Sequence, residues 1–406
     1  MQTLILLLAS TLAVQAGRVE VGPWCGAVTP TSAVVKARTT GEVWLELPDR
    51  PPVAPTFSES GLATYRLENL KPDTLYTYRL GDRGGQFRTF PTGRASFRFV
   101  FGSCSTGTNH PVYRAMAETE PLFYLHLGDL HYADIATNEP ALYRRALESV
   151  FGQPYHAELL QRAPLVYVWD DHDYGPNDSD RTSPSRAAAQ KVYREYIPHY
   201  PLLDAEAIYQ SFTVGRVKFL LTDLRSHRTP NAAEDNEEKS MMGAAQKAWF
   251  LQQLLDARNR YPLVFWVSSV TWIGKAGRAD HWAGFSNERR QLANFFKQHG
   301  IHNVCMLTGD GHCVAADDGR NGDYAEGGGA PLPVLMSSPL DQGGNCKGGP
   351  YSHGLYVPGR GEGMYGVVDV EDRGDEILVT FHGRNHRHEE KVHLQLGMTA
   401  SGIDDP

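Results

Sequence analysis

The chain lacks three features that would assign it to a large class of proteins: a long apolar run past its first residues, an excess of basic residues, and a high cysteine content. A helix that crosses a bilayer needs about 18 or more apolar residues in succession, and no segment after residue 16 approaches that length. The 39 Lys and Arg are outnumbered by 47 Asp and Glu, which gives a formal net charge of −8. This balance argues against a surface that follows a nucleic-acid backbone. We therefore expect neither a membrane anchor nor a specific nucleic-acid surface.

Residues 1–16 contain no charged side chain. They are mostly apolar and end in the small residue Ala16, a pattern typical of a secretory signal peptide. We predict that residues 1–16 are removed and that the mature protein is secreted or periplasmic.

Five cysteines are an odd number for an exported protein: Cys25, Cys104, Cys305, Cys313 and Cys346. At least one is therefore free or takes part in chemistry, and Cys104 is our candidate. The other four have no diagnostic spacing. They form two disulfides in one of three connectivities or remain buried thiols.

Neither glycine-rich segment, residues 327–329 nor residues 343–349, has the Lys-Ser/Thr ending and following helix of a phosphate-binding P-loop. We expect both to be long loops near the mouth of a site.

The chain changes character near residues 90–94. Before that point, short alternating runs at residues 33–37, 43–47 and 75–80 are separated by Pro, Gly and Asp, as in a small antiparallel β-sandwich. Residues 70–78 resemble the region of fibronectin III-like domains that carries a tyrosine corner. We predict a fibronectin III/Ig-like β-sandwich over residues 17–93.

After that boundary, strand, loop and helix patterns follow one another, which indicates an α/β layered domain over residues 94–406. The expected strands are 97–102, 121–127, 165–169, 217–221, 263–268 and 304–307, and the expected helices are 111–118, 139–151 and 245–257.

Side chains able to bind metal follow several of these strands. Asp129 and Tyr132 come just after residues 121–127, the acidic run 170–173 follows residues 165–169, and Asp310 with His312 follows residues 304–307. Open α/β sheets bind ligands at the carboxyl ends of their strands. Ordinary turns or an acidic surface loop are the alternatives for any one cluster, but the repetition at strand ends favours a shared metal site.

Six segments in this order resemble the alkaline phosphatase D (PhoD-like) branch of the calcineurin-like metallophosphoesterases. The matching segments are 102–105 (GSCS), 128–132 (GDLHY), 169–173 (WDDHD), 223–228 (DLRSHR), 242–249 (MGAAQKAW) and 309–312 (GDGH). The resemblance implies a four-layer α/β/β/α sandwich behind the N-terminal β-sandwich.

The resemblance also implies a set of metal ligands. Cys104, Asp129 and Tyr132 fall where the family binds a ferric ion, and Asp129 also bridges toward further divalent ions, calcium in the family. Asp171 and Asn177 fall at the second position, where we prefer Asp171 over Asp170. Asp310 and His312 match the closing ligands, and His172 matches the histidine near the phosphate.

The donor types support this assignment independently. Thiolate and phenolate on one ion favour a trivalent or soft transition metal such as iron over magnesium. The oxygen ligands of Asp171 and Asn177 suit calcium or another hard divalent ion. We expect Arg225 and Arg228 to form structural or surface ion pairs, so they stay outside the predicted site.

The sequence thus predicts an exported, metal-dependent phosphoesterase that hydrolyses small-molecule phosphate monoesters, diesters or both by attack of a metal-activated hydroxide. Two alternatives are a protein that binds metal and phosphate ligands without turnover, and a purely structural exported protein. We expect a monomer.

Overall fold

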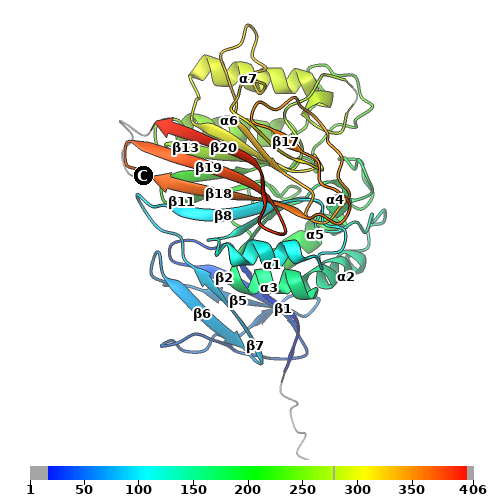
Figure 1. The fold of residues 1–406 in the computed structure, drawn as a ribbon. Coiled ribbons are helices and arrows are strands. Elements are labelled where there is room, and N and C mark those ends of the chain that lie inside the picture. The colour runs from blue at the N-terminus through cyan, green and yellow to red at the C-terminus, as the bar shows by residue number, and fades with distance from the viewer. Residues whose placement is uncertain (1–16, 278, 400–406) are drawn as a thin grey trace, which may run out of the picture.

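The computed structural model describes residues 17–277 and 279–399. The predicted signal peptide lies outside this range. Within it, strands are gathered into one ten-stranded, one seven-stranded and one three-stranded sheet, and none of the described helices is both long and apolar enough to span a bilayer. Figure 1 shows the strands that follow residue 94 in the upper part of the molecule, with the N-terminal strands below.

The ten-stranded sheet has the order β20-β19-β18-β8-β9-β10-β1-β2-β5-β4. Its central strands β8, β9 and β10 run parallel to one another. The bounds of the ten strands are β1 Val19–Gly26, β2 Ala33–Thr39, β4 Thr56–Phe57, β5 Leu62–Leu67, β8 Phe97–Gly102, β9 Tyr124–Leu127, β10 Leu165–Val168, β18 Met364–Asp372, β19 Glu376–Asn385 and β20 Glu390–Thr399.

The seven-stranded sheet has the order β11-β12-β13-β14-β16-β15-β17, and its strands β12, β13, β14 and β16 are parallel. Its strands are β11 Gln210–Val214, β12 Val217–Leu221, β13 Leu263–Ser268, β14 Val304–Thr308, β15 Val314–Asp317, β16 Val334–Ser337 and β17 Leu355–Tyr356. The three-stranded sheet is made of β3 Leu45–Glu46, β6 Leu75–Leu80 and β7 Arg83–Arg88.

The N-terminal strands join the large sheet directly. β1 pairs antiparallel with β2 and, at Gly26, parallel with β10 at Leu165. A Cβ on Gly26 would lie 2.5 Å from the carbonyl oxygen of Leu165, so this contact needs a glycine. The ten-stranded sheet therefore runs without a break from the N-terminal region into the α/β region. The boundary at residue 93 stays a prediction.

Helices cover the outer faces of the two large sheets. Buried side chains of one cluster pack α1, α2, α3 and α5 against the ten-stranded sheet, and those of another pack α6 and α7 against the seven-stranded sheet. A third cluster fills the space between the sheets. The helices are α1 Pro111–Glu118, α2 Pro140–Phe151, α3 Pro154–Arg162, α4 Asp171–Tyr174, α5 Arg186–Tyr196, α6 Ala244–Ala257 and α7 Ser286–His299, with a 3-10 turn at Trp282–Phe285.

These layers confirm the expected α/β/β/α sandwich behind a β-rich N-terminal region. Trp272 and Trp282, which suit either a pocket or a core from the sequence, are fully buried in the cluster under α6 and α7. They are core residues.

Candidate metal centre

The predicted ligands lie where strands of both large sheets end. Cys104 follows β8, Asp129 follows β9 and Asp171 begins α4 just after β10, so parallel neighbours deliver three of them to one edge. Asp310 follows β14 of the other sheet. Ligand atoms of Cys104, Asp129, Asp310 and His312 all lie within 4.8 Å of one another.

These four residues share an uncommon backbone conformation. Their φ angles are 63° at Cys104, 57° at Asp129, 58° at Asp310 and 54° at His312. Side-chain-bearing residues rarely occupy this left-handed region, and such strain collects at functional sites, where surrounding structure holds it. The chain therefore leaves each strand in a sharp turn that directs these side chains to one point.

Asp173 holds one of these turns in place. Its carboxylate accepts hydrogen bonds from the backbone amides of Asp129 (2.5 Å), Leu130 (2.7 Å) and His131 (3.1 Å), and also from the amide of Asp170 (3.1 Å). Gly128 precedes the turn at φ 98°, and a Cβ there would lie 2.5 Å from Cβ of Asp170. Asp173, the last residue of the acidic run 170–173, thus positions Asp129 by accepting hydrogen bonds from these backbone amides.

The sulfur of Cys104 lies in a polar, buried setting. It is 3.5 Å from Oδ2 of Asp129 and 3.1 Å from the hydroxyl of Ser338. The phenol of Tyr132 donates to the same Oδ2 at 3.1 Å. Burial, and then the nearby carboxylate of Asp310, raises the pKa of the Cys104 thiol to about 11, so a thiolate here needs a cation.

The carboxylates of this centre also fit a cation. Oδ1 of Asp129 and Oδ2 of Asp310 are buried without a hydrogen-bond partner in the described structure, which is costly unless an ion or water satisfies them. Burial raises the pKa of Asp310 to about 7 and that of Asp129 well above its usual range, with the charge of Asp171 adding to the rise. The residues present therefore fit a bound metal.

His312 is oriented for metal binding. Its Nδ1 lies 2.9 Å from the carbonyl oxygen of Gly343. Because a carbonyl oxygen only accepts, Nδ1 carries the proton, and Nε2 keeps the lone pair that a metal needs.

A second, adjoining group contains Asp171, Asp178 and Asp280, whose ligand oxygens lie within 4.8 Å of one another. Asn177, the predicted partner of Asp171, is exposed, although the amide of the next residue, Asp178, donates to Asp171 at 2.7 Å. Asn177 as a ligand stays a prediction. Asp280 was not expected from the sequence because it lies in a loop with no recognisable motif.

Asp170 is held by other groups. Its Oδ1 accepts hydrogen bonds from Nε of Arg225 and from the hydroxyl of Ser269, at 2.7 and 2.8 Å. Its Oδ2 is buried without a hydrogen-bond partner in the described structure, while Asp171 belongs to two of the possible metal-binding groups. The preference for Asp171 stays a prediction.

Arg225 and Arg228 form the ion pairs that the sequence led us to expect, but inside the protein. Both side chains are fully buried and contact Asp280 at 2.8 and 2.6 Å. These two guanidinium groups hold the pKa of Asp280 well below its usual range against the effect of burial. They stabilise a charged carboxylate at the edge of the second group.

His172 lies beside both groups, since one of its nitrogens lies within 4.8 Å of ligand atoms of Asp129 and Asp171. Its Nδ1 is 2.6 Å from Oδ1 of Asp134, and its ring lies 4.2 Å from that of Tyr132. Asp134 and Tyr132 therefore fix the orientation of this imidazole. The sequence pattern did not indicate Asp134.

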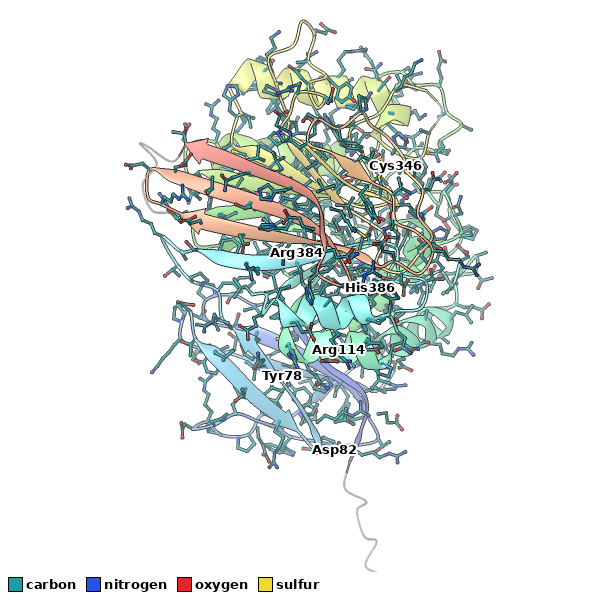
Figure 2. The ribbon with its side chains drawn as sticks, viewed as in Figure 1. Tyr78, Asp82, Arg114, Cys346, Arg384 and His386 are labelled. Carbon is teal, nitrogen blue, oxygen red and sulfur yellow. A yellow bond between two sulfur atoms is a disulfide. The ribbon has the colours of Figure 1, made fainter. Side chains whose placement is uncertain are left out.

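Lys347 adds a positive charge to the centre that sequence reasoning missed. Its Nζ donates to Oδ1 of Asp310 at 2.5 Å. The preceding residue, Cys346, forms a disulfide with Cys313, the neighbour of His312, so the glycine-rich segment 343–349 is tied to the centre (Figure 2 labels Cys346). No sequence signal pointed to Lys347, because the spacing of the cysteines does not show which of them pair.

The remaining cysteines are thiols. Cys25, Cys104 and Cys305 are free and buried. Two disulfides among the other four cysteines, one of the alternatives, is therefore wrong: only Cys313 and Cys346 approach each other, while Cys25 and Cys305 lie in the core.

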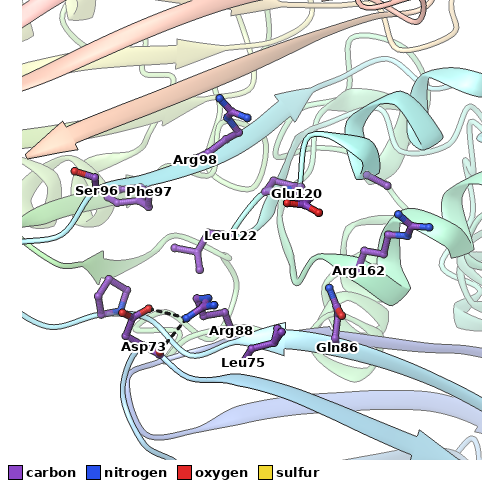
Figure 3. A pocket seen from close by; sticks show the side chains of 13 residues that line it. Asp73, Leu75, Gln86, Arg88, Ser96, Phe97, Arg98, Glu120, Leu122 and Arg162 are labelled. Carbon is purple, nitrogen blue, oxygen red and sulfur yellow. Dashed lines mark hydrogen bonds and ion pairs between the residues drawn. The ribbon is translucent and has the colours of Figure 1, made fainter.

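A cavity of about 760 Å³ lies apart from this centre, at the opposite end of β8. It separates the three-stranded sheet from the start of β8, and Figure 3 shows the ion pair of Asp73 with Arg88 on one of its walls. Its other arginines, Arg98 and Arg162, also contact carboxylates. It contributes no residue to the metal centre.

Comparison with known proteins agrees with the fold and with the motifs. Residues 99–349 match the model of the PhoD-like phosphatase family. Alkaline phosphatase D of Bacillus subtilis (strain 168) is 25% identical over 310 residues, which cover 62% of this chain and 53% of that protein. The chain thus spans about half the length of this curated relative.

Two solved structures have similar folds. A structure of PhoD superimposes with a TM-score of 0.75 and 17% identity, covering 94% of this chain and 93% of that one. A purple acid phosphatase from yellow lupin (Lupinus luteus) seeds gives a TM-score of 0.62 and 12% identity over 94% and 75% of the two chains. Since the family match covers more than half of the sequence, the chain belongs to the PhoD-like phosphatase family.

Proposed function

We propose that this protein is an exported, metal-dependent phosphoesterase that hydrolyses phosphate monoesters, diesters or both. The observation that carries the proposal is the convergence of Cys104, Asp129, Asp310 and His312 within 4.8 Å. Two of these carboxylates have buried oxygens that lack a partner in the described structure. Such a centre binds cations, and cations at a buried edge bind phosphate esters.

The donor set supports iron at the first position and calcium, or another divalent ion, at the second. Cys104 and Tyr132 offer thiolate and phenolate, which favour a ferric ion, while Asp171 and Asn177 offer the oxygen ligands that calcium prefers. Bound ions at this centre supply positive charge to the phosphoryl oxygens and lower the pKa of water.

Side chains of the protein then orient the ester and donate a proton to its leaving group. His172, held by Asp134 at 2.6 Å, is placed to protonate the leaving alkoxide or to stabilise charge in the transition state. Lys347 offers a second cation for the phosphate oxygens.

An open cavity of about 660 Å³ adjoins the centre and suits the alcohol part of the ester. Its lining includes Thr106, two residues after Cys104, and Gly343, whose carbonyl holds His312. Arg360 lies in the same lining. The cavity is bounded by loop residues such as Gly343 and Gly344, so the path of this loop sets which esters enter.

The test is metal analysis of the purified chain together with hydrolysis of p-nitrophenyl phosphate and bis(p-nitrophenyl) phosphate. We expect iron in the wild type, turnover of at least one ester, and loss of at least about a thousandfold in kcat/KM in Asp129→Ala, about 4 kcal/mol of transition-state stabilisation. Glu139→Gln is the matched control, because Glu139 is exposed and its side chain makes no cap hydrogen bond.

The outcomes separate the alternatives. Metal-loaded protein that binds phosphate but turns over neither ester identifies a binding protein. Unchanged turnover in Asp129→Ala contradicts the proposed centre.

A further inference from the structure

A second group of metal-binding side chains lies on the last two strands of the ten-stranded sheet. His382 lies on β19, and Glu390 and His393 lie on β20, the edge strand. One ligand atom from each of the three lies within 4.8 Å of the others. Arg384, two residues after His382, is labelled in Figure 2 and marks this part of the sheet. No residue of the Cys104 centre belongs to this group.

A β-bulge brings Glu390 to the same face as both histidines. His382 lies opposite His393 in the register, whereas Arg384 lies opposite Glu390, so Lys391 is one extra residue on β20. Along a regular strand, side chains three residues apart point to opposite faces. The extra residue cancels this alternation, as bulges do where they redirect a side chain.

The three side chains face one another across the two strands. Glu390 lies between the histidines, with Oε2 2.5 Å from Nδ1 of His382 and Oε1 3.4 Å from Nδ1 of His393. The two imidazole rings lie 5.1 Å apart. The side chain of His382 is 18% exposed, that of Glu390 41% and that of His393 48%, so an ion from solvent reaches all three.

The other nitrogen of His382 is also partnered. Its Nε2 lies 3.5 Å from Oδ2 of Asp369, and Arg98 holds that carboxylate with two hydrogen bonds of 2.7 and 3.0 Å. A histidine that binds metal through one nitrogen usually donates its other N–H to a carboxylate, which fixes the ring. Asp369 provides this carboxylate for His382, and Arg98 holds it in place.

We propose that His382, Glu390 and His393 bind a zinc ion, with a water molecule as the fourth ligand. Two imidazoles and one carboxylate in a tetrahedral arrangement are a common zinc ligand set. The ion joins β19 to the edge strand β20 and therefore stabilises that edge of the sheet. The proposal does not depend on the phosphoesterase activity.

The test is zinc titration of the full chain, with bound zinc counted per chain and the thermal midpoint Tm recorded. We expect Asp129→Ala, which alters the Cys104 centre, to keep this zinc site. We expect His393→Ala to lose one zinc ion per chain and the zinc-dependent rise in Tm. His393 is about half exposed, so its removal leaves the core intact.

Cobalt(II) distinguishes the two centres by spectroscopy. In the His382 site it shows the visible bands of a tetrahedral ion with nitrogen and oxygen ligands, and these bands disappear in His393→Ala. In the Cys104 centre it adds a thiolate charge-transfer band, which remains in His393→Ala.

Two further variants sharpen the test. Asp369→Asn keeps all three ligands but removes the outer carboxylate, so zinc affinity falls about ten- to a hundredfold. His302→Ala removes an exposed loop histidine outside the group and leaves affinity unchanged. Equal zinc stoichiometry and affinity in wild type and His393→Ala overturns the proposal.

Discussion

Lys347 donates a hydrogen bond of 2.5 Å from its ammonium group to Oδ1 of Asp310. The lysine lies on the glycine-rich segment 343–349, and the disulfide of Cys346 with Cys313 ties that segment to the strand that follows His312. The charge of Asp310 in turn raises the pKa of Lys347 against the effect of burial, so the ion pair favours the ammonium form of the lysine.

The first prediction concerns this lysine. Under the proposed function Lys347 offers a cation to the phosphate oxygens, so in Lys347→Gln the KM for p-nitrophenyl phosphate should rise about tenfold, equivalent to about 1.4 kcal/mol of binding. Lys347→Arg keeps the charge and should recover part of the loss. Steady-state kinetics measure both. Lys191→Gln, which breaks an exposed ion pair with Glu59, is the control, and an unchanged KM in Lys347→Gln would contradict the role.

The second prediction concerns the disulfide. Replacing Cys313 and Cys346 together by serine frees a loop whose ends are 33 residues apart, which should lower the free energy of unfolding by about 4 kcal/mol. Since the loop also carries Lys347, KM should rise as in Lys347→Gln. Urea unfolding and kinetics on the same double variant test the two effects, and Cys25→Ala, which alters a buried free thiol, shows whether the KM change is specific.

The third prediction concerns colour. A ferric ion bound by Cys104 and Tyr132 should give the protein a visible charge-transfer band. Tyr132→Phe removes the phenolate and should shift or abolish the band while circular dichroism stays unchanged, because phenylalanine keeps the ring that packs against His172 and loses only the hydroxyl that donates to Asp129. An iron-loaded wild type without such a band would rule out a phenolate or thiolate ligand.

The fourth prediction concerns Asp173. Asp173→Asn replaces one carboxylate oxygen by an amide group that cannot accept a backbone N–H, so the turn at Asp129 loses charge-assisted hydrogen bonds. We expect a loss of about 1 to 3 kcal/mol in unfolding free energy and about tenfold weaker metal binding. Equilibrium dialysis against a metal indicator measures the binding. Retained affinity would show that Asp129 is held by other contacts.

The fifth prediction concerns pH. Burial raises the pKa of Asp310 from 3.8 to about 7 in the metal-free protein. A carboxyl with a raised pKa binds more protons in the folded state than in the unfolded state, so it costs nothing below pH 4 and destabilises the fold progressively as pH rises toward 7. The chelated protein should therefore lose several degrees of Tm between pH 5 and pH 8, and Asp310→Asn should reduce that loss. Saturating metal should reverse it, and a Tm of the chelated wild type that rises over this interval contradicts the assignment.

Much of the fold was predictable because hydrophobic periodicity is local. The strand at Phe97–Gly102 and the helix at Pro111–Glu118 were expected with the same bounds. The strand expected at 121–127 is shorter, Tyr124–Leu127. Leu122 and Phe123 still form backbone hydrogen bonds with Arg98 and Val100 of β8, so the apolar run found the right segment but not the residue at which regular strand geometry begins.

The metal centre, like the fold, was predictable only in part. The sequence by itself determined which side chains follow the strands, since Cys104, Asp129 and Asp310 each come just after an apolar run, and parallel strands deliver such residues to one edge. Only the tertiary structure decided what else meets them. Lys347, Asp280 and Asp134 come from loops with no periodic signal, and the bulge at Lys391 that turns Glu390 toward His382 depends on the pairing of two strands. Loop paths and strand register are set by long-range contacts, which a local pattern does not encode.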